Sequence, residues 1–474
     1  MIKFGTGGWR AIIGEDFIKE NVICLAQGLS DLIIEEKVDK FGIVIGFDRR
    51  FLSDKAACWI AEVLAGNNIN VYFIEQYVPT PMVMHAVNQY QTYYGAAVTA
   101  SHNPYDYNGV KIITYEGRDA NENVTQKIEE KIKFLRKEQI KIFPFKKGIK
   151  NGLIKFIDPF NNYIDNVISK IDLDSIKKKR LKILFDPMFG ASTITLNTVF
   201  NILRCQVELI NARHDPLFGG RIPSPSFLTL KTLMNLVPEK GYDLGLGTDG
   251  DGDRLGIIDE KGEFIHPNEI LCLLYYYFLE YKKLDGGIVR NITTTHLLDR
   301  IANYYGQDCH EVPVGFKHIS QKMEETKALM GGESSGGVAI RGHLKGKDAT
   351  VTSCYIIEMI CNTNKLIGDL RKELHLKFGT LYYEEFNIPL THEDKSILTK
   401  ILFHEKKLPS FKFIVDKISY LDGVKIYFQN DGWAVFRFSG TEPLLRLSTE
   451  MPSKKEALSV ISSMHTYIKK IIGK

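Results

Sequence analysis

The sequence has no long hydrophobic run and no leader-like start, and each absence excludes a class of protein. The longest apolar run, Ile270 to Leu279, has ten residues, fewer than the roughly 18 that a membrane-spanning helix requires. The first residues lack the basic start and the apolar stretch of a signal peptide. We therefore expect a cytoplasmic protein that has no membrane partner.

The sequence also has no large excess of positive or negative charge and no paired-cysteine motif. The 61 Lys and Arg residues nearly balance 57 Asp and Glu residues, for a net charge of +4 over 474 residues, which argues against a nucleic-acid partner bound through its phosphates. The seven cysteines are scattered and form no Cys-x-x-Cys pair, which disfavours a disulfide framework or a thiolate zinc site. Apolar residues make up 44% of the chain, enough for a large buried core.

A similar unit appears three times along the chain: an apolar β-rich run, a turn, an amphipathic helical stretch and a second apolar run. The apolar runs of the first copy are 43–47 and 71–74, those of the second are 183–185 and 207–210, and a weaker third copy spans 288–313. Strands that alternate with helices imply crossover connections on a largely parallel sheet. The pattern predicts three similar α/β domains with mixed, largely parallel sheets.

The end of the chain has a different pattern. The runs 424–429, 433–438 and 445–450 predict antiparallel strands, with a turn at 430–432. A capping box at Ser453 and Glu456 begins the last helix, which could lie on a membrane surface but is better explained as packing on a core. The apolar face predicted for it consists of Leu458, Ile461, Met464, Ile468 and Ile472. These elements predict a smaller C-terminal α+β domain.

The first of four loops that could carry chemistry is 99–111, which follows the apolar run 95–98. Functional groups concentrate at the ends of strands in α/β sheets. The loop contains Ser101 and His102 and ends at Lys111. A serine before a histidine is by default an ordinary loop residue, and the absence of a Gly-x-Ser-x-Gly elbow argues against an acyl-transfer hydrolase.

The second loop, 248–254, places three carboxylates at alternate positions with glycines between them: Asp249, Asp251 and Asp253. Such a loop can curl so that the carboxylates converge on one hard cation. A calcium loop of the EF-hand type is the alternative, and Glu260 falls at its twelfth position, but Arg254 occupies the sixth, where glycine is required. Three carboxylates leave coordination positions open, which suits Mg²⁺ shared with a phosphate.

Two further glycine-rich loops offer polar groups. In 331–337, Glu333 and Ser335 could bind adjacent sugar hydroxyls, although a plain turn is the simpler explanation. In 437–443, an arginine, two hydroxyls and exposed backbone N–H groups could form a phosphate cradle, although a tight hairpin would have the same pattern. The residues of this cradle are Arg437, Ser439, Gly440 and Thr441.

Together, the four loops resemble those of the α-D-phosphohexomutases, in the order of that family and along the whole chain. The segments that carry the resemblance are Thr99-Ala-Ser-His-Asn-Pro104, Asp249-Gly-Asp-Gly-Asp-Arg254, Gly332-Glu-Ser-Ser-Gly336 and Arg437-Phe-Ser-Gly-Thr-Glu-Pro443. The resemblance implies four domains around a central active-site cleft, each of which contributes one loop. On this basis we expect α/β domains at 1–145, 146–254 and 255–372 and the α+β domain at 373–474.

The resemblance also implies a mechanism. Ser101 would carry a phosphoryl group and exchange it with a hexose 1-phosphate through a hexose 1,6-bisphosphate, which is both intermediate and activator. Mg²⁺ would be bound by Ser101 and the three aspartates, with Lys111 or Arg10 as the acid/base group and His102 either orienting the serine loop or serving only a structural role. The implied substrate-binding residues are Arg254, Lys317, Glu333, Ser335, Arg437, Ser439, Gly440 and Thr441.

Within the family, segments 106–109 and 314–318 look like the phosphoglucomutase and phosphomannomutase branches. The chain departs from the family pattern at Gly7 and Ala11, which weakens the assignment of Arg10. It departs again at Ala349, where glycine more often follows the aspartate. A phosphoglucosamine mutase, a sugar phosphatase that uses phosphoserine and a non-catalytic sugar-phosphate sensor remain alternatives. The expected partners are small sugar phosphates, with the chain itself a monomer or a homodimer, and the sequence does not choose between glucose and mannose.

Overall fold

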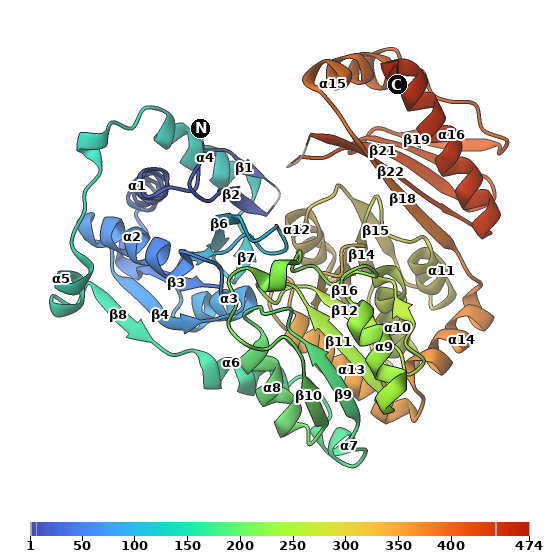
Figure 1. Ribbon diagram of the computed structural model, residues 1–474, viewed down its shortest axis with the longest axis horizontal. Coiled ribbons are helices and arrows are strands. Elements are labelled where there is room, and N and C mark those ends of the chain that lie inside the picture. Colours follow the sequence, from blue (N-terminus) through green and yellow to red (C-terminus); the bar gives the residue numbers. More distant parts are fainter. Residues whose placement is uncertain (1, 6, 441–442, 474) are drawn as a thin grey trace. The chain divides into compact units, whose positions relative to one another are not determined.

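The structure is a computed structural model that describes residues 2–5, 7–440 and 443–473. The chain divides into two compact units. Unit 1 comprises Met1–Ile270 and Ser335–Leu370, and unit 2 comprises Leu271–Ser334 and Arg371–Lys474. Figure 1 labels their helices and strands. Within the described part of the chain, no helix combines the length and the apolar character that crossing a membrane requires.

Unit 1 begins with a mixed sheet of eight strands. They are β1 (Phe4–Gly5), β2 (Gly8–Ile12), β3 (Ile43–Phe47), β4 (Val71–Tyr77), β5 (Tyr94–Val98), β6 (Tyr107–Thr114), β7 (Arg118–Asp119) and β8 (Ile154–Ile157). Their order is β1-β2-β6-β5-β3-β4-β8, with β7 beside β6. The strands β3, β4, β5 and β8 run parallel, whereas β6 pairs antiparallel with β5.

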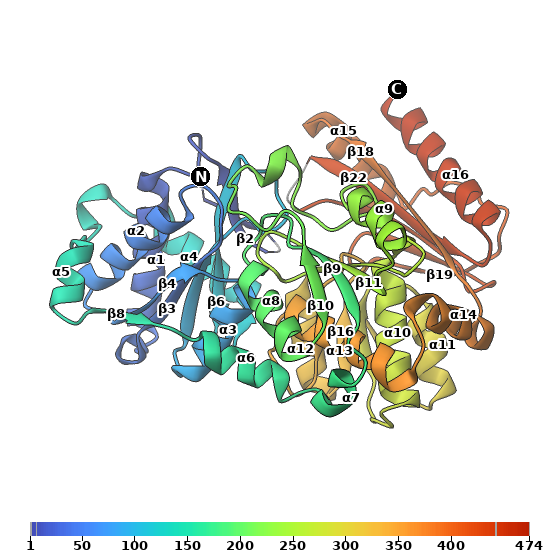
Figure 2. The ribbon, with the colours of Figure 1, turned by 60° about the horizontal axis from the view of Figure 1, so that its bottom comes forward.

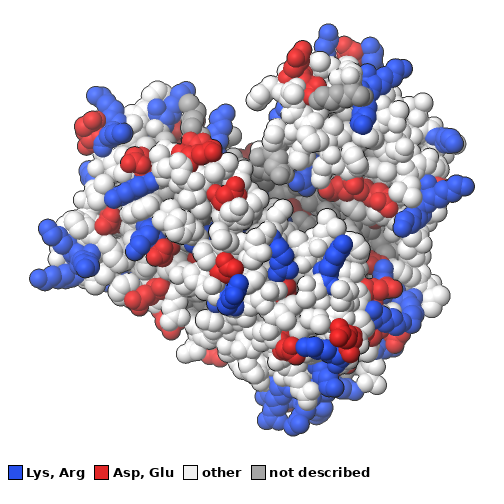
Figure 3. Space-filling view, in the orientation of Figure 1, with Lys and Arg blue, Asp and Glu red and all other residues white. Residues whose placement is uncertain are grey.

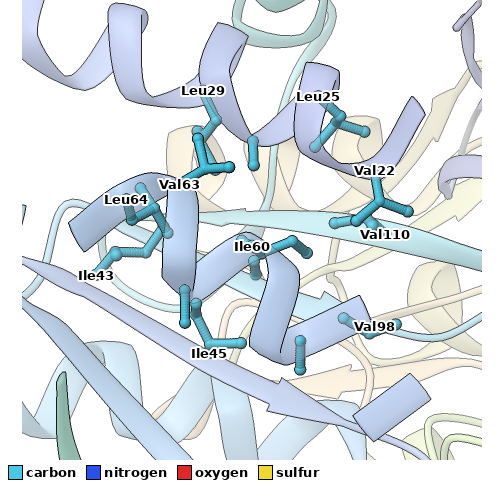
Figure 4. Packing of buried hydrophobic residues seen from close by; sticks show 14 of the residues in the cluster. Val22, Leu25, Leu29, Ile43, Ile45, Ile60, Val63, Leu64, Val98 and Val110 are labelled. Atoms are coloured by element: carbon cyan, nitrogen blue, oxygen red, sulfur yellow. The ribbon is translucent and has the colours of Figure 1, made fainter. Parts of the chain in front are cut away.

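Five helices accompany this sheet: α1 (Lys19–Glu35), α2 (Ser53–Gly66), α3 (Thr80–Gln89), α4 (Glu122–Lys133) and α5 (Phe145–Lys150). Ile43 and Ile45 of β3 pack with α1 and α2 in one buried cluster, in which Leu25 and Ile60 also take part (Figure 4). Helix α3 packs on β3 and β5. Because β3 is entirely buried, its run of apolar residues has the pattern of a central parallel strand.

The second sheet of unit 1 contains β9 (Lys182–Asp186), β10 (Gln206–Leu209), β11 (Leu244–Thr248), β12 (Leu255–Ile258) and β13 (Phe264–Ile265) in the order β10-β9-β11-β12-β13. Leu184 packs in a cluster with Leu233, whereas its neighbour Phe185 contacts Phe200. These two partners belong to α9 (Lys231–Lys240) and α8 (Thr193–Ile202), which therefore cover opposite faces (Figure 2). Unit 1 also contains α6 (Phe160–Ile168), α7 (Leu173–Lys177), β17 (Val338–Ile340) and α13 (Ala349–Thr363).

Unit 2 contains two further groups of strands. In the first, β14 (Ile288–Asn291) lies between β15 (Cys309–Val312) and β16 (Met330–Gly332), and all three are parallel. The second is an antiparallel sheet of β18 (Tyr382–Pro389), β19 (Val415–Ser419), β20 (Val424–Phe428), β21 (Trp433–Phe438) and β22 (Leu444–Met451) in the order β18-β22-β21-β20-β19. The helices that lie wholly in unit 2 are α11 (Leu297–Tyr304), α12 (Phe316–Thr326), α15 (His392–Thr399) and α16 (Lys454–Ile472). Two more, α10 (Pro267–Glu280) and α14 (Ile367–Phe378), begin in unit 1 and continue into unit 2.

The predicted fold class, with three α/β domains and a C-terminal α+β domain, is confirmed. The paired strands of each repeat are parallel with a helix between them, as the pattern predicted. The first sheet extends to β8 and the second to β13, beyond the domain ends expected at 145 and 254. The domain ranges themselves stay a prediction.

One prediction about the last helix is wrong in part. Ser453 caps α16 by accepting a hydrogen bond from the Glu456 N–H, as predicted, but Leu458 is 48% exposed. The other four predicted residues do pack on the core: Met464 and Ile468 are buried, and Ile461 and Ile472 are partly buried against the same cluster. The buried face also includes Ala457 and Val460, which the pattern did not indicate. The small Ala457 can approach the sheet closely, so the buried face is turned away from Leu458.

Charged side chains of both signs are interspersed on the face of the molecule that Figure 3 shows. This mixture agrees with the net charge of +4. A large field of one sign, which would attract a polyanion over a distance, is not visible on that face.

Candidate active site

Ser101 lies in the loop between β5 and β6, at an end of the first sheet. Its φ is 51°, a left-handed conformation that costs a residue other than glycine about 1–2 kcal/mol. The Ser101 N–H donates to Thr99 Oγ1 (2.8 Å), and the Ser101 hydroxyl donates to Asp249 Oδ2 (3.0 Å). The serine side chain of the first sheet is thus fixed against a carboxylate of the second.

The acidic loop connects β11 to β12, which pair as an antiparallel hairpin. Its three aspartates are buried, and each offers an oxygen within 4.8 Å of the others. Asp249 Oδ1 accepts from the N–H groups of Asp253 (2.9 Å) and Arg254 (3.0 Å), which curls the loop. A Cβ at Gly250 would lie 2.7 Å from Ser101 O, so only glycine lets this loop approach the serine so closely.

Two lysines compensate the charge of the aspartates. Lys111 of β6 donates to Asp251 Oδ2 (2.6 Å) and to Asp253 Oδ2 (2.7 Å). Lys347 forms an ion pair with Asp253 Oδ2 at 3.1 Å. Thr80 also donates to Asp251 Oδ2 (2.6 Å). The lysines therefore keep the buried carboxylates paired with positive charge.

The pKa values of this cluster follow from burial and from these charges. Burial, followed by the neighbouring Asp253 and Asp251, raises the pKa of Asp249 well above its ordinary value. Burial would also raise the pKa of Asp253, but Lys111, Lys347 and Arg254 lower it well below the ordinary range. Burial would lower the pKa of Lys111, yet the two carboxylates that it contacts raise it above the ordinary value.

The aspartates also fit a hard divalent cation. Asp251 Oδ1 and Asp253 Oδ1 are buried and have no hydrogen-bond partner among the residues that the structure describes. A buried carboxylate oxygen without a partner is costly. Carboxylate oxygens are preferred ligands of Mg²⁺ and Ca²⁺. The two oxygens, together with Asp249 nearby, are therefore suitable ligands for such an ion.

Arg10 and His102 lie at the same site. Arg10 Nη1 donates to Asn103 Oδ1 (2.5 Å), next to the serine loop, and burial together with Arg254 lowers the pKa of Arg10 to about 10. His102 Nδ1 lies 3.4 Å from Ser101 Oγ. Burial and the nearby Arg254, Arg10 and Lys347 lower the pKa of His102 well below 6.5, so its ring is neutral at pH 7.

The remaining predicted residues belong to unit 2, with one exception. Glu333 Oε1 accepts from the Gly315 N–H (3.1 Å) and from Asn291 Nδ2 (3.3 Å). Lys317 is in the first turn of α12. Ser335 belongs to unit 1, because the division of the chain falls between Ser334 and Ser335. Its neighbour Gly336 accepts a hydrogen bond from the N–H of Leu255, directly after the acidic loop.

The last predicted loop joins β21 to β22. Arg437 Nε donates to Asp422 Oδ2 (2.8 Å), and the same carboxylate oxygen accepts from the Val314 N–H (2.8 Å). The Ser439 N–H donates to Leu444 O (2.9 Å) across the hairpin, and Gly440 follows at its tip. Thr441 lies outside the described residues. Asp422 thus ties the Arg437 loop to the segment that precedes Lys317.

The sequence did not indicate Thr80, Asp119, Lys347 or Asp422 as site residues. Asp119 acts on the cluster through its charge, which raises the pKa of Lys111 further. Each of these residues reaches the site by tertiary contact, and none of the four predicted loops contains it. Lys347 had a weak signal, since it begins the Lys347-Asp348-Ala349 segment, one of those compared with the family pattern.

Comparison with protein-family models matches four segments, which make up most of the chain, to one family. The models are described as phosphoglucomutase/phosphomannomutase alpha/beta/alpha domains I, II and III and C-terminal domain, and they match residues 1–139, 161–262, 266–378 and 393–464.

Individual proteins agree with the family models over nearly the full length. A phosphoglucomutase/phosphomannomutase of Thermococcus kodakarensis is 31% identical over 96% of this chain and 95% of its own length. A phosphoglucosamine/phosphogalactosamine mutase of Sulfurisphaera tokodaii is 27% identical over 97% of this chain and 98% of its own. The solved structure of a phosphoglucomutase/phosphomannomutase family protein of Burkholderia thailandensis has a TM-score of 0.82 at 21% identity, over 100% of this chain and 98% of the other. The chain therefore belongs to the phosphoglucomutase/phosphomannomutase family and is an enzyme of the mutase class that acts on sugar phosphates.

Proposed function

We propose that this enzyme interconverts a hexose 1-phosphate and a hexose 6-phosphate of glucose or mannose through a phosphoserine at Ser101. The observation that carries the proposal is the placement of the Ser101 hydroxyl, 3.0 Å from Asp249 and in one buried cluster with Lys111. A serine that only stabilised a loop would not require the strained φ of 51° next to three carboxylates.

The proposed cycle contains two phosphoryl transfers. In the first, the 6-hydroxyl of the hexose 1-phosphate attacks phosphorus and the bond between phosphorus and Ser101 Oγ breaks. The proton of the 6-hydroxyl passes to Ser101 Oγ, which becomes a free hydroxyl. The hexose 1,6-bisphosphate then reverses in the site, and the Ser101 hydroxyl takes the 1-phosphoryl group, with the proton returned to the sugar oxygen. The product is the hexose 6-phosphate. A hexose 1,6-bisphosphate is also the donor that phosphorylates a free enzyme.

We assign the cation site to Asp249, Asp251 and Asp253, together with the phosphorylated Ser101, and the ion to Mg²⁺. When bound, Mg²⁺ would neutralise charge on the transferring phosphoryl group. The support is the pair of buried carboxylate oxygens on Asp251 and Asp253 that lack hydrogen-bond partners among the described residues.

Lys111 and Arg10 are the candidates that move the proton of the reacting hydroxyl. Lys111 retains its proton in the present arrangement, since two carboxylates accept hydrogen bonds from it. It can therefore donate to the oxygen that leaves Ser101. Arg10 and Arg254 would bind phosphoryl oxygens by charge-assisted hydrogen bonds. His102, which is neutral at pH 7, would accept or donate a hydrogen bond near Ser101 Oγ.

The loops of unit 2 would bind the parts of the substrate that do not react. Glu333, with Ser335 from unit 1, is assigned to the sugar hydroxyls, and Lys317 to a further substrate contact. Arg437, Ser439, Gly440 and Thr441 are assigned to the phosphate group at the far end of the hexose. Asp422 accepts a hydrogen bond from Arg437 Nε, so both terminal nitrogens of this guanidinium could still donate to a phosphate.

Phosphoglucosamine mutase activity is the second candidate, since the similar protein of Sulfurisphaera tokodaii is named for amino sugars. The two candidates differ in the substituent at C2. Rates with the 1-phosphates of glucose, mannose and glucosamine, measured by ³¹P NMR with a trace of glucose 1,6-bisphosphate, separate them. Preference for glucose or mannose supports the proposal, and a preference for glucosamine by more than tenfold would replace it with the second candidate.

The same spectra test two other classes. Release of inorganic phosphate without a 6-phosphate product would indicate a phosphatase. Unchanged substrates in the presence of Mg²⁺ and bisphosphate would indicate a sugar-phosphate sensor. Either result would overturn the proposal, because a mutase must return every phosphoryl group to a sugar.

A further inference from the structure

The turn after β3 lies beside the serine loop. Strands β3 and β5 are parallel neighbours, with Phe47 paired to Val98. They therefore end at the same edge of the first sheet, where the Asp48 N–H donates to Val98 O (3.1 Å). This places Asp48 and Arg50, which follow β3, next to the loop that follows β5.

The Arg50 guanidinium binds four backbone carbonyls of that loop. Its Nη2 donates to Ser101 O (2.6 Å) and Asn103 O (2.6 Å), while Nη1 donates to Pro104 O (2.7 Å) and Tyr107 O (3.0 Å). The Arg50 side chain is completely buried. Both terminal nitrogens donate to this loop, so the arginine holds the backbone around Ser101 in place.

Asp48 holds the other side of Ser101. Asp48 Oδ2 accepts from the Thr99 hydroxyl (2.6 Å), and Thr99 Oγ1 in turn accepts from the Ser101 N–H (2.8 Å). The same Asp48 oxygen lies 3.4 Å from Arg50 Nε. The carboxylate is itself fixed, because Oδ1 accepts from the Arg50 N–H (2.9 Å) and from the Ser53 hydroxyl (2.7 Å).

One connected network therefore holds the N–H and the carbonyl oxygen of the same residue. Ser101 has a φ of 51°, a conformation that a serine free of restraint rarely adopts. We propose that Asp48 and Arg50 are positioning residues, which hold Ser101 in its left-handed conformation and thereby direct its hydroxyl at Asp249. This inference rests on the proposed role of Ser101 as phosphoryl carrier.

A positioning role predicts a specific kinetic effect. Neither residue has been assigned a contact with the sugar or with its phosphates, so removing Arg50 should leave substrate binding nearly intact. The transfer step should slow, since a displacement of about 1 Å of a reacting group can cost 10²-fold in rate. Loss of kcat with a nearly constant KM is therefore the expected signature.

Arg49 provides a matched control. It is the adjacent arginine and is also buried, but its Nη1 donates to Ala212 O (3.0 Å) in the second domain of unit 1. Arg49→Ala should lower Tm, because a buried arginine and its hydrogen bond are removed. It should leave the contacts of the serine loop unchanged. The comparison separates an effect on Ser101 from general destabilisation.

The experiment measures kcat, KM for glucose 1-phosphate, Tm and the rate at which Ser101 is labelled by ³²P glucose 1,6-bisphosphate. For Arg50→Ala we expect kcat and the labelling rate to fall about 10²-fold with KM changed less than threefold. Arg50→Lys should recover part of the loss, and Arg49→Ala should keep a normal kcat. Unchanged kcat in Arg50→Ala, or an equal loss in Arg49→Ala, would overturn the inference.

Thr99→Val is the second variant, in case Arg50→Ala does not fold. It keeps the shape of the side chain and removes the hydroxyl between Asp48 and the Ser101 N–H, so kcat should fall with KM retained. Normal labelling in this variant would contradict the proposal. Ser101→Ala, assayed in parallel, isolates the proposed function: if this variant still turns over, the phosphoserine mechanism is wrong. If Ser101→Ala is inactive while Arg50→Ala and Thr99→Val keep normal activity, the proposed function stands and only the positioning inference is wrong.

Discussion

The predicted site residues of the two units differ in how many hydrogen bonds hold them in place. In unit 1, Ser101, Lys111 and the three aspartates are buried and joined by hydrogen bonds between 2.6 and 3.0 Å. In unit 2, Arg437 depends on one oxygen of Asp422, which it shares with the Val314 N–H. Groups that transfer a phosphoryl group benefit from preorganisation, whereas groups that hold a reversing intermediate must also release it. The difference agrees with the proposed function, in which Ser101 and the aspartates transfer the phosphoryl group and Arg437 binds a phosphate that does not react.

The largest effect is expected from removing the hydroxyl of Ser101, which tests whether the residues of unit 1 carry out the transfer. Ser101→Ala should lower mutase activity by at least about 10³-fold, because the covalent route is lost. The coupled assay for glucose 6-phosphate measures the loss. Ser169→Ala, which changes an exposed serine of α6's C-terminal end, should retain full activity. Near-normal turnover in Ser101→Ala would refute the assignment of chemistry to unit 1.

Removal of the metal is expected to have the next largest effect. Treatment with a chelator should lower activity by about 10²-fold or more, since neutralising the transferring group is worth several kcal/mol. Added Mg²⁺ should restore the activity. Asp251→Asn should require a higher Mg²⁺ concentration for half-maximal rate. Full activity after rigorous chelation would show that the three carboxylates have another role.

Arg437→Ala tests the retaining role of unit 2. A charge-assisted hydrogen bond contributes about 1.5–3 kcal/mol, so KM for the hexose phosphate should rise about 10- to 100-fold. The variant should also depend on added glucose 1,6-bisphosphate, because the intermediate escapes. Ser101 should still be phosphorylated in the purified protein. An unchanged KM without such dependence would mean that the loop is only a hairpin; exposed Arg204→Ala serves as the control.

Asp422→Asn should have a smaller effect of the same kind. The amide can accept from the Val314 N–H but lacks the charge that fixes Arg437, so a rise in KM of about three- to tenfold is expected. Steady-state kinetics with hexose 1-phosphate provide the measurement. Asp416→Asn on the exposed strand β19 is the matched control. A fall in kcat at constant KM would contradict the division of roles between the units.

The smallest effect concerns a buried cluster within unit 2. Burial, and then the charges of Arg290 and Lys425, lowers the pKa of His296 from 6.5 to about 3. The other charged groups around it are Glu311, Asp299 and Glu450. The unfolded chain takes up this proton near pH 6.5 and the folded chain does so only near pH 3, so stability is lost as the pH falls between these values.

The free energy of unfolding should therefore fall less between pH 7 and pH 5 in His296→Gln than in the unchanged chain. The difference corresponds to at most one proton that the unfolded chain takes up and the folded chain does not. Urea unfolding at the two pH values measures the difference. His404→Gln, at an exposed position, should show the same pH dependence as the unchanged chain. An identical loss in His296→Gln would mean that His296 does not contribute to the acid sensitivity.

The sequence predicted elements whose signal is local. The strands 43–47 and 183–185 were found because buried parallel strands have continuous apolar runs, and the Asp249 loop because its spacing is a property of the chain itself. Lys347 and Asp422 could not be assigned, since each gains its role from a partner far away in the sequence. Four of the five residues predicted for the apolar face of α16 contact the core, and only Leu458 is exposed, because Ala457 is buried in its place. That choice depends on the space above the sheet, which the local pattern does not specify.

The left-handed conformation of Ser101 also limits which amino acids could replace it in its proposed role as phosphoryl carrier. Threonine has the same hydroxyl, but its branched Cβ is disfavoured at a φ near 51°. Cysteine would fit the backbone, yet its thiol would be placed in an acidic environment that opposes the thiolate. The backbone conformation at position 101 therefore restricts which side chains fit, whatever their reactivity. An exchange of serine for threonine at this position would not be a conservative change.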